Sequence, residues 1–474
     1  MENLIKRLKK DTNNAIDITY RKKIIDNNDI YIIYNNSLTS DDNISDFVVR
    51  SLTYIDRNNK GNINDNIENN ISNFNIITVN NYEEICKYLN KGFTIILTKS
   101  KYYALETKKN LNRGITSPTT ESNIRGAMDS FIENYETNIG LIRKRIQSND
   151  LWIERINVGK YTNTFVGVLS INGVVKKELV NDIIERIKKI NIDGIIDTGT
   201  LKNLLIKEDK VIFPITVSTE RPDVVALNLL KGKVAIVIDN SPFVIIVPAL
   251  FNDFFKTIDD NYSQSINTTF SRIISFIAFF IALLTPAIYI ALTTYNQETI
   301  PTELLVNFAL QRDGVPFPAF FEAIIMLLSF EILKESDIRV PSFTGSALSI
   351  VGALILGEAA VNAGIVSPIM IIVIAITSIS SLIFIEADLS KGLRWYRLLF
   401  MLGASFMGLI GIVIVFIYFM IKLSDIKSFG IPYLTPFAPF YKEGLKDSII
   451  KVPENNRTKR ESYLSNNIIR ERNK

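Results

Sequence analysis

The feature that most constrains this chain is a series of long apolar stretches that carry almost no charge. No charged residue occurs between Arg272 and Glu298, and most residues from 273 to 293 are apolar. A helix of this length crosses the roughly 30 Å hydrocarbon core of a bilayer, because it rises about 1.5 Å per residue. Three more stretches share the property: residues 340–366, interrupted only by Glu358, residues 368–385 and residues 398–421. We therefore predict four membrane-spanning helices.

One apolar segment allows more than one interpretation. Residues 317–333 carry Glu322 and Glu331, and Pro316 precedes them. The segment fits a fifth span, a re-entrant piece or an interfacial helix. Its length and its charges favour the last two.

The number of spans decides which side each charged segment faces. With four spans the basic C-terminal tail lies on the side of the N-terminal part, as the positive-inside rule prefers. The basic loop with Lys391, Arg394 and Arg397 then lies on the opposite side, which the rule disfavours. With five spans the basic loop lies on the side of the N-terminal part, and the basic tail lies on the opposite side. We prefer four spans because the tail has more basic residues, and this places head and tail in the cytoplasm.

Charge density divides the chain into a head, an apolar middle and a tail. Residues 1–272 carry 36 basic and 33 acidic side chains, residues 273–421 carry 6 and 10, and residues 422–474 carry 11 and 6. The first residues have no apolar segment behind their charges, so we expect no secretory signal peptide and a cytoplasmic head. The predicted domains are two α/β subdomains of the head, residues 1–115 and 116–270; an all-α transmembrane domain, residues 271–421, with four spans plus an amphipathic or re-entrant helix; and a short basic tail, residues 422–474.

The head shows the alternation of a mixed α/β domain. Between residues 127 and 147, apolar residues recur at steps of three and four, which predicts an amphipathic helix. Gly114 and Pro118 mark the boundary between the two subdomains. Short β-branched or aromatic runs predict strands at residues 30–34, 74–79, 93–98, 165–171, 211–217, 234–238 and 243–247.

The residue inventory argues against an enzyme. The chain has no histidine and one cysteine, Cys86. These counts exclude Ser-His-Asp triads, histidine-based zinc sites, disulfides within the chain and every site built on two cysteines. No phosphate-binding glycine motif follows a predicted strand. The charge balance does not suggest nucleic-acid binding. We therefore predict no catalytic residues, no cofactor and no metal.

The second predicted span carries two distinct faces. In a helix over residues 345–366, steps of four, three and four place four residues on one face: Val351, Ile355, Glu358 and Asn362. The nearly opposite face carries small residues that allow helices to pack closely in lipid: Ala353, Gly357, Ala360 and Gly364. A carboxylate that faces lipid costs on the order of 2–3 kcal/mol, so Glu358 must be protonated, paired or hydrated. A neutral or Asn-bonded Glu358 inside a helix bundle and a polar ring on a pore axis both satisfy this requirement.

Several ordered motifs then point to a family. In the head they are residues 121–129 (ESNIRGAMD), 137–145 (TNIGLIRKR), 219–223 (TERPD) and 237–248 (VIDNSPFVIIVP). In the apolar part and the tail they include residues 286–291 (PAIYIA), 297–301 (QETIP), 312–318 (RDGVPFP), 364–368 (GIVSP) and 428–436 (SFGIPYLTP). The chain resembles the A subunits of the GerA-type nutrient germination receptors of endospore-forming bacteria. It departs from the usual family pattern at Ala127, Asn240 and Glu358.

The resemblance implies a function and partners. Such A subunits lie in the spore inner membrane with a transporter-like B subunit, which binds the nutrient, and a lipoprotein C subunit. The resemblance implies a homo-oligomer that acts as a ligand-gated channel for monovalent cations and triggers germination. In that reading Glu358 and Asn362 form a polar ring, and Val351 and Ile355 form an apolar constriction. Two alternatives stay open: a non-conducting scaffold that transmits the signal, and a SpoVAF-type channel that amplifies ion release.

The TERPD motif has two interpretations. Pro222 between charged residues fits a fixed surface turn in which Arg221 pairs with Glu220 or Asp223. The resemblance instead suggests a contact for assembly, between protomers or with loops near the membrane. The residues assigned to that interface are Arg125, Glu220, Arg221 and Asp223.

Overall fold

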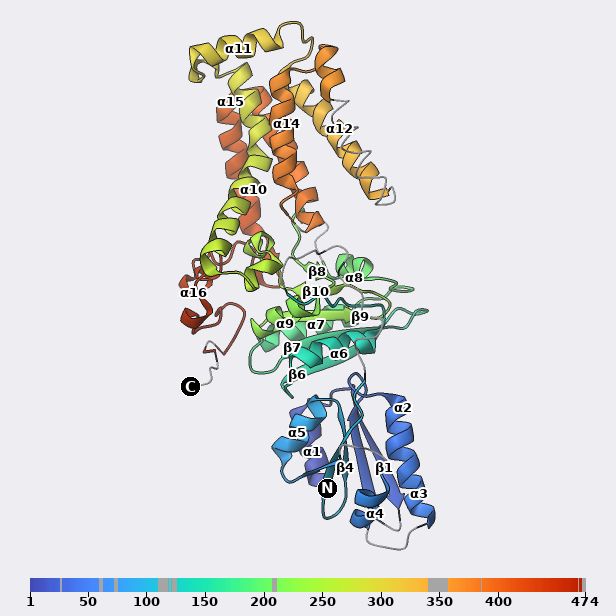
Figure 1. Ribbon diagram of the computed structural model, residues 1–474. Coiled ribbons are helices and arrows are strands. Elements are labelled where there is room, and N and C mark those ends of the chain that lie inside the picture. The colour runs from blue at the N-terminus through green and yellow to red at the C-terminus, as the bar shows by residue number, and fades with distance from the viewer. Residues whose placement is uncertain are drawn as a thin grey trace.

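The chain forms three parts stacked along one long axis, as the computed structural model shows (Figure 1). An N-terminal α/β subdomain lies at one end, a second α/β subdomain lies in the middle, and a helical domain of residues 265–425 lies at the other end. The structure describes residues 1–25, 28–58, 63–71, 76–109, 118, 121, 126–206, 211–339, 357–384, 386–467 and 469–470.

The first subdomain is an antiparallel five-stranded sheet between two layers of helices. Its strand order is β1-β2-β4-β5-β3. One apolar cluster packs α1 and α5 against one face of the sheet, and another packs α3 and α4 against the opposite face. The elements are α1 (Glu2–Asp11), β1 (Ile18–Ile25), β2 (Asn28–Asn35), α2 (Asp41–Asn43), α3 (Arg50–Asn58), α4 (Ile63–Asn70), β3 (Ile76–Val79), α5 (Tyr82–Asn90), β4 (Phe93–Leu97) and β5 (Tyr102–Glu106).

The second subdomain repeats this plan. Its sheet is also antiparallel, and the order β6-β7-β9-β10-β8 matches that of the first sheet strand for strand. Strands β9 and β10 consist of β-branched residues and Ala, and every residue in them is buried, because helices cover both faces. The elements are α6 (Tyr135–Arg145), β6 (Leu151–Val158), β7 (Thr164–Ile171), α7 (Lys177–Lys188), α8 (Thr198–Leu205), β8 (Val217–Thr219), α9 (Pro222–Leu230), β9 (Val234–Ile238) and β10 (Val244–Val247).

Two predictions about the head were wrong. Residues 211–216 do not form a strand, because β8 begins at Val217. The predicted helix over residues 127–147 begins only at Tyr135, where the Asn134 side chain accepts a hydrogen bond from the Thr137 backbone N–H and caps the helix. The residues before it run alongside the second sheet instead, and the Phe131 N–H donates to the Glu220 carbonyl.

The helical domain consists of long helices that run lengthwise and one helix that lies across the far end, away from the head (Figure 1). The helix across the far end is α11. Residues 319–333 of the predicted segment belong to α12, which packs lengthwise against α14. The interfacial interpretation of residues 317–333 was therefore wrong. The elements are α10 (Ser265–Thr294), α11 (Thr302–Arg312), α12 (Ala319–Arg339), α14 (Pro368–Ser381) and α15 (Ala387–Asp425).

Two of the described helices are long and apolar enough to cross a membrane, Ser265–Thr294 and Asp388–Asp425. The four predicted spans are thus not confirmed. The second of these helices is not straight, because Gly408 has φ 61° and ψ −138° and reverses the chain direction. Tyr396 and Phe419 have ring centroids 4.8 Å apart. Along a continuous helix these residues would be roughly 34 Å apart, so α15 is a hairpin with antiparallel arms.

The hairpin brings the tail back to the head. The turn at Gly408 lies at the far end, where the Leu409 N–H donates to the Asn296 side chain. The second arm then returns, and the Ser428 hydroxyl donates to the Ile215 carbonyl of the head. The predicted basic loop is not a loop, because Lys391, Arg394 and Arg397 lie in the first turns of α15. This segment lies at the head, since Lys202 binds Asp388. The basic segment and the tail therefore share one side, which neither four nor five straight spans provides.

The predicted tail packs as part of the head rather than as a separate domain. Tyr433 is buried, and its carbonyl accepts a hydrogen bond from the Phe251 N–H. Near the end of the chain, the Ser465 hydroxyl donates to the Val174 carbonyl. The tail contains β11 (Lys427–Ser428), β12 (Ile431–Pro432) and α16 (Lys442–Leu445).

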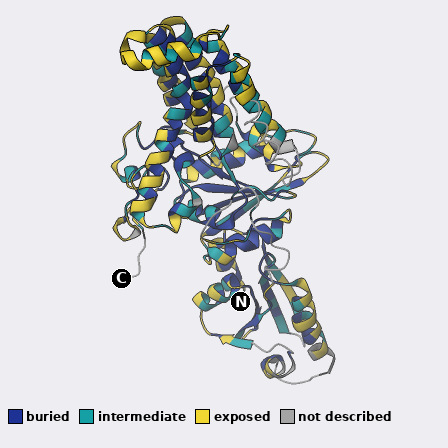
Figure 2. Cartoon of the chain, turned by 45° about the horizontal axis from the view of Figure 1, so that its top comes forward, coloured by how far each residue is buried: buried dark blue, intermediate teal, exposed yellow. Residues whose placement is uncertain are grey.

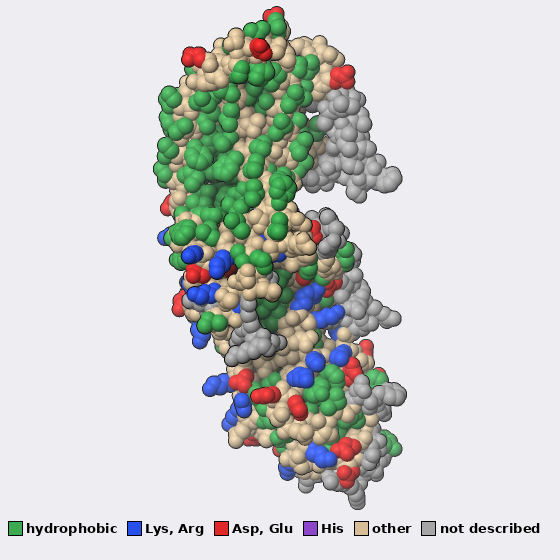
Figure 3. Space-filling view, turned by 60° about the vertical axis from the view of Figure 1, so that its left-hand side comes forward, with side chains coloured by type: hydrophobic (Ala, Val, Ile, Leu, Met, Phe, Trp, Pro, Cys, Tyr) green, Lys and Arg blue, Asp and Glu red, His purple; other side chains and the backbone are tan. Residues whose placement is uncertain are grey.

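Burial differs between the two halves of the molecule (Figure 2). The central strands of both sheets are buried, whereas the helical domain exposes the outer faces of its helices. These faces are apolar, and Figure 3 shows them as a broad band of hydrophobic side chains over the helical domain. On α15 the exposed apolar residues include Phe406, Ile410, Val413, Ile414 and Ile417.

We predict that Gly408→Ala destabilises the folded chain more than Gly430→Ala. Both glycines have positive φ, so both substitutions impose backbone strain of about 1–3 kcal/mol. A Cβ at Gly408 would lie 2.5 Å from Asn296 Oδ1 and 2.8 Å from Tyr295 Cβ, whereas nothing lies within 4 Å of one at Gly430. Thermal unfolding of the two full-length variants in detergent checks this. Equal losses would show that the hairpin turn is not tightly packed.

Candidate functional site at the junction of the head and the helical domain

The head and the helical domain meet at a buried cluster of aromatic rings. After β10, the 3₁₀ turn η2 (Phe251–Phe255) places its phenylalanines against the lower part of α10. Phe255 stacks on Phe276 with centroids 3.9 Å apart, and Phe251 meets Phe279 edge-on at 5.3 Å. Burial of such large rings is the dominant favourable term at the junction. The aromatic cluster fixes where α10 leaves the head.

Asp253 anchors this turn electrostatically. Its carboxylate accepts bonds from Lys233 at 2.7 Å and Lys256 at 3.2 Å, and also from the Leu250 N–H. Burial alone would raise the pKa of Asp253, but the two lysines hold it well below its usual range. Asp253 therefore stays ionised and ties strand β9, which follows Lys233, to the η2 turn.

Asp447 is the second anchor and joins three segments that are distant in sequence. Its carboxylate accepts bonds from Lys231 after α9 at 3.1 Å, Arg272 in α10 at 3.2 Å and Arg457 in the tail at 3.0 Å. Burial would raise its pKa, but Lys231, Lys256, Arg457 and Arg272 together hold the pKa well below its usual range. Removal of one partner from such a buried network typically costs about 3–5 kcal/mol.

Arg272 connects these anchors to the first turns of α10. Its Nε donates to Asp260 at 2.7 Å, and one terminal nitrogen donates to the Ser448 carbonyl at 2.7 Å. Lys451 donates to the carbonyl of Asp260 from the tail. A shift of α10 along its axis would therefore break several buried charged contacts at once.

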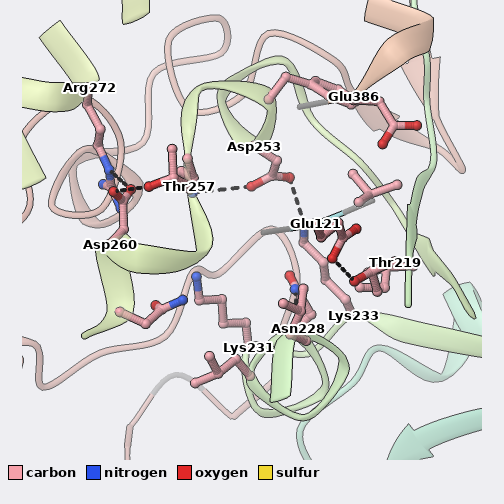
Figure 4. Close-up of a pocket in the computed structure, with 17 residues that line it drawn as sticks. Glu121, Thr219, Asn228, Lys231, Lys233, Asp253, Thr257, Asp260, Arg272 and Glu386 are labelled. Carbon is pink, nitrogen blue, oxygen red and sulfur yellow. Dashed lines mark hydrogen bonds and ion pairs between the residues drawn. The ribbon is translucent and has the colours of Figure 1, made fainter. Parts of the chain in front are cut away.

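A polar cavity of about 120 Å³ lies within this junction (Figure 4). One side carries the cationic side chains, and the other carries Glu121 and Glu386. The Thr219 hydroxyl donates to Glu121 at 2.7 Å. Burial, with a smaller contribution from the nearby Glu220 and Glu386, raises the pKa of Glu121 to about 7, against the lowering effects of the Thr219 hydrogen bond and of Arg221. Glu121 thus differs from the acids above in that its charge is disfavoured at neutral pH.

The TERPD motif lies beside this cavity as a buried clamp. Arg221 has no exposed surface, and its guanidinium makes a bidentate ion pair with the Asp223 carboxylate at 3.2 and 2.8 Å. It also donates to the Ala127 carbonyl, while the Glu220 carboxylate accepts from the Glu121 N–H. Tyr262, on the way to α10, donates to Asp223. The surface-turn interpretation was therefore wrong about exposure, because the pair of Arg221 and Asp223 is buried.

These contacts lie within one chain, and the assembly role assigned to Glu220, Arg221 and Asp223 stays a prediction. Arg125 lies outside the described residues. Sequence reasoning missed the lysines and aspartates of the junction, which carry no motif spacing. The available signal was the passage that begins at Phe251, in which Asp253, Lys256 and two further aspartates stand among aromatic residues.

The predicted pore residues are described only in part. Val351, Ile355 and Ala353 lie outside the described residues. Residues 357–362 are helical, and Glu358 and Asn362 are both exposed, while Gly357 is buried beside Ile371 of α14. Ala360 packs against the core of the domain.

The predicted helix over residues 345–366 ends earlier than expected. Gly364 has φ +65°, and the Ile365 N–H donates to the Ala360 carbonyl. The Gly364 N–H donates to the Val361 carbonyl, which completes a glycine C-cap of the Schellman type. Gly364 is therefore a helix stop rather than a packing position.

The far end of the helical domain holds a buried carboxylate. Glu322 of α12 has no exposed surface and accepts bonds from both the N–H and the hydroxyl of Ser367, at 2.8 and 2.9 Å. Arg312 lies 3.5 Å from it. These contacts join the RDGVPFP and GIVSP motifs. Among the described residues, no group of three or more acidic, histidine or cysteine side chains could hold a metal ion.

The fold and the junction define a class of protein with a duplicated α/β head fixed by buried ion pairs to a domain of long apolar helices. The sequence matches the family described as Bacillus/Clostridium GerA spore germination protein over residues 6–463, and the chain belongs to this family. The resemblance inferred from the motifs is thereby confirmed.

Relatives agree with this assignment. Spore germination protein KA of Bacillus subtilis is 43% identical over 341 residues, which are 72% of this chain and 63% of KA. This chain thus spans less than two thirds of that protein. Spore germination protein GerLA of Bacillus cereus is 33% identical over 436 residues, 91% of this chain and 89% of GerLA. The crystal structure of the N-terminal domain of the A subunit of the Bacillus megaterium spore germinant receptor GerK3 aligns at 28% identity and a TM-score of 0.41, covering 52% of this chain and 94% of that chain.

We predict that Glu121→Gln removes a pH dependence of stability. Because the folded pKa of about 7 exceeds the ordinary value of 4.5, the contribution of Glu121 is full below pH 4.5 and declines as the pH rises to about 7. The parent should therefore lose about 1–3 kcal/mol between pH 4.5 and 8 that the variant does not lose. Thermal unfolding of full-length protein at both pH values measures this. The exposed Glu133, as Glu133→Gln, is the control, and an identical pH profile for all three proteins would refute the assignment.

Proposed function

We propose that this chain is the A subunit of a nutrient germinant receptor in the spore inner membrane, where it oligomerises into a ligand-gated channel for monovalent cations. Family membership supports the role in germination. The apolar faces of α10 and α15 support a membrane location, because exposure of so large an apolar surface to water is unfavourable. The nutrient-binding B subunit and the lipoprotein C subunit are the partners proposed from the family resemblance.

The observation that carries the channel role is the shared exposure of Glu358 and Asn362. They stand four residues apart on one helical face in an otherwise apolar segment, and Gly357 turns toward α14 on another face. A carboxylate exposed to lipid would cost on the order of 2–3 kcal/mol or more, whereas a water-filled axis between protomers removes that cost. A ring of carboxylates favours cations.

The charge distribution supports an orientation with the head on the cytoplasmic side of the membrane, which in a spore faces the spore core. The tail and the start of α15 with Lys391 lie at the head, while Glu298, Glu303 and Asp313 are exposed at the far end. The positive-inside rule therefore favours a cytoplasmic head and tail. The junction described above then lies at the inner membrane surface, where movement of the head would reach α10 directly.

We predict that Glu358→Lys abolishes cation flux through the reconstituted full-length chain. A lysine ring replaces attraction of cations by repulsion, so flux of a monovalent cation into liposomes should fall at least about tenfold. Ile355→Ala, which removes bulk from the proposed constriction, supplies an open background without nutrient. Glu303→Lys makes the same charge change in α11 and should conduct like its parent.

Two results would contradict the channel proposal. If the Ile355→Ala protein assembles in liposomes but passes no cations, the chain is a scaffold that transmits the signal to another channel. If it conducts and Glu358→Lys conducts equally well, this helix does not line the conduction path.

A further inference from the structure

A cavity of about 240 Å³ lies between α12 and the first arm of α15, on the side of the helical domain. Its two ends differ in polarity. Glu331, Arg394 and Arg397 lie at one end, whereas Leu327, Leu398 and Met401 line the other. The helix directions explain the difference. α12 runs from the far end toward the head and the first arm of α15 runs away from the head, so both place their charged residues nearer the head.

Arg397 is the unusual residue of this cavity. Its side chain is 7% exposed, and its Nε donates to the Ala282 carbonyl at 2.7 Å. That carbonyl is free because Pro286, four residues later in α10, has no N–H to bond with it. Among the described residues no carboxylate pairs with Arg397. A guanidinium has five N–H donors, so four remain for a ligand in the cavity.

The polar end of the cavity lies at the level where the head meets the helices. Head residue Phe213 stacks on Tyr396, with centroids 5.3 Å apart. Trp395 and Tyr418 are exposed at the same level. Exposed Trp and Tyr beside basic residues mark the boundary between lipid tails and headgroups. Arg394 and Arg397 therefore lie within reach of the phosphates of the leaflet on the head side.

We propose that this cavity binds one anionic phospholipid from that leaflet. Its phosphate is held by Arg397 and Arg394, and one acyl chain lies against Leu327, Leu398 and Met401. Glu331 pairs with Arg394 and offsets one of the two charges, so the empty site keeps one net positive charge. The complementary ligand is therefore an amphiphile with one negative charge. This inference rests on the proposed membrane location but not on the channel role.

Native mass spectrometry of the full-length chain in a neutral detergent tests the proposal. The protein is incubated with phosphatidylglycerol or with phosphatidylcholine, and the retained lipid is counted. The parent should retain phosphatidylglycerol preferentially. Arg397→Gln should weaken retention roughly fivefold, because one basic residue near the membrane surface contributes about that factor. Lys391→Gln removes a positive charge from the same helix outside the cavity and should retain lipid like the parent.

A second variant covers the case in which Arg397→Gln fails to fold. Leu328 lines the cavity but is exposed, so Leu328→Trp fills the apolar end without disturbing the core and should also lose the lipid. Equal retention of both lipids, or equal phosphatidylglycerol retention by all variants, would overturn the proposal. Displacement of the lipid by excess inorganic phosphate would show a free-anion site instead. Dissociation of an oligomer by Leu328→Trp without lipid loss would show that a second copy of the chain covers the cavity.

Discussion

The junction between the head and α10 depends on a few buried carboxylates, each of which binds more than one basic side chain. Asp447 alone joins the end of α9, the base of α10 and the tail, three segments brought together from across the sequence. Desolvation of these charges is costly, and it is offset only because every partner stays in place. The network therefore behaves as a unit. A displacement of the head must either carry α10 with it or break several ion pairs, and this gives the head a physical route to the helical domain.

The helical domain relies on two backbone interruptions that are themselves satisfied by distant residues. Pro286 leaves a carbonyl that Arg397 binds, and Gly408 permits a reversal that Asn296 caps. In an apolar environment an unsatisfied backbone group is expensive, so each interruption fixes the position of a second helix. The hairpin also explains why both basic segments, the first turns of α15 and the tail, lie on the head side of the molecule.

Much of this architecture follows from the sequence, and the exceptions have physical causes. Apolar length and charge density locate the helical domain, and β-branched runs locate most central strands, because both signals are local. The reversal at Gly408 is not local, since a glycine within an apolar run also fits an unbroken helix until Asn296 is found beside it. The same holds for Arg221, which donates to the distant Ala127 carbonyl, and for its partner Asp223, which accepts from Tyr262. The repeated strand order of the two subdomains leaves no trace in residue spacing. Of the candidate site, the face with Glu358 and Asn362 follows from helical periodicity, whereas the lysines around Asp253 follow only from the tertiary fold.

The central claim is that the ion pairs at the junction couple the head and tail to α10, and a double-mutant cycle between Arg272 and Asp447 tests it most directly. Unfolding free energies are measured in detergent for the parent chain, Arg272→Gln, Asp447→Asn and the double variant. The account predicts a coupling energy of about 1–3 kcal/mol, because the two groups contact each other inside a buried network. Additive effects, with a coupling energy near zero, would contradict it.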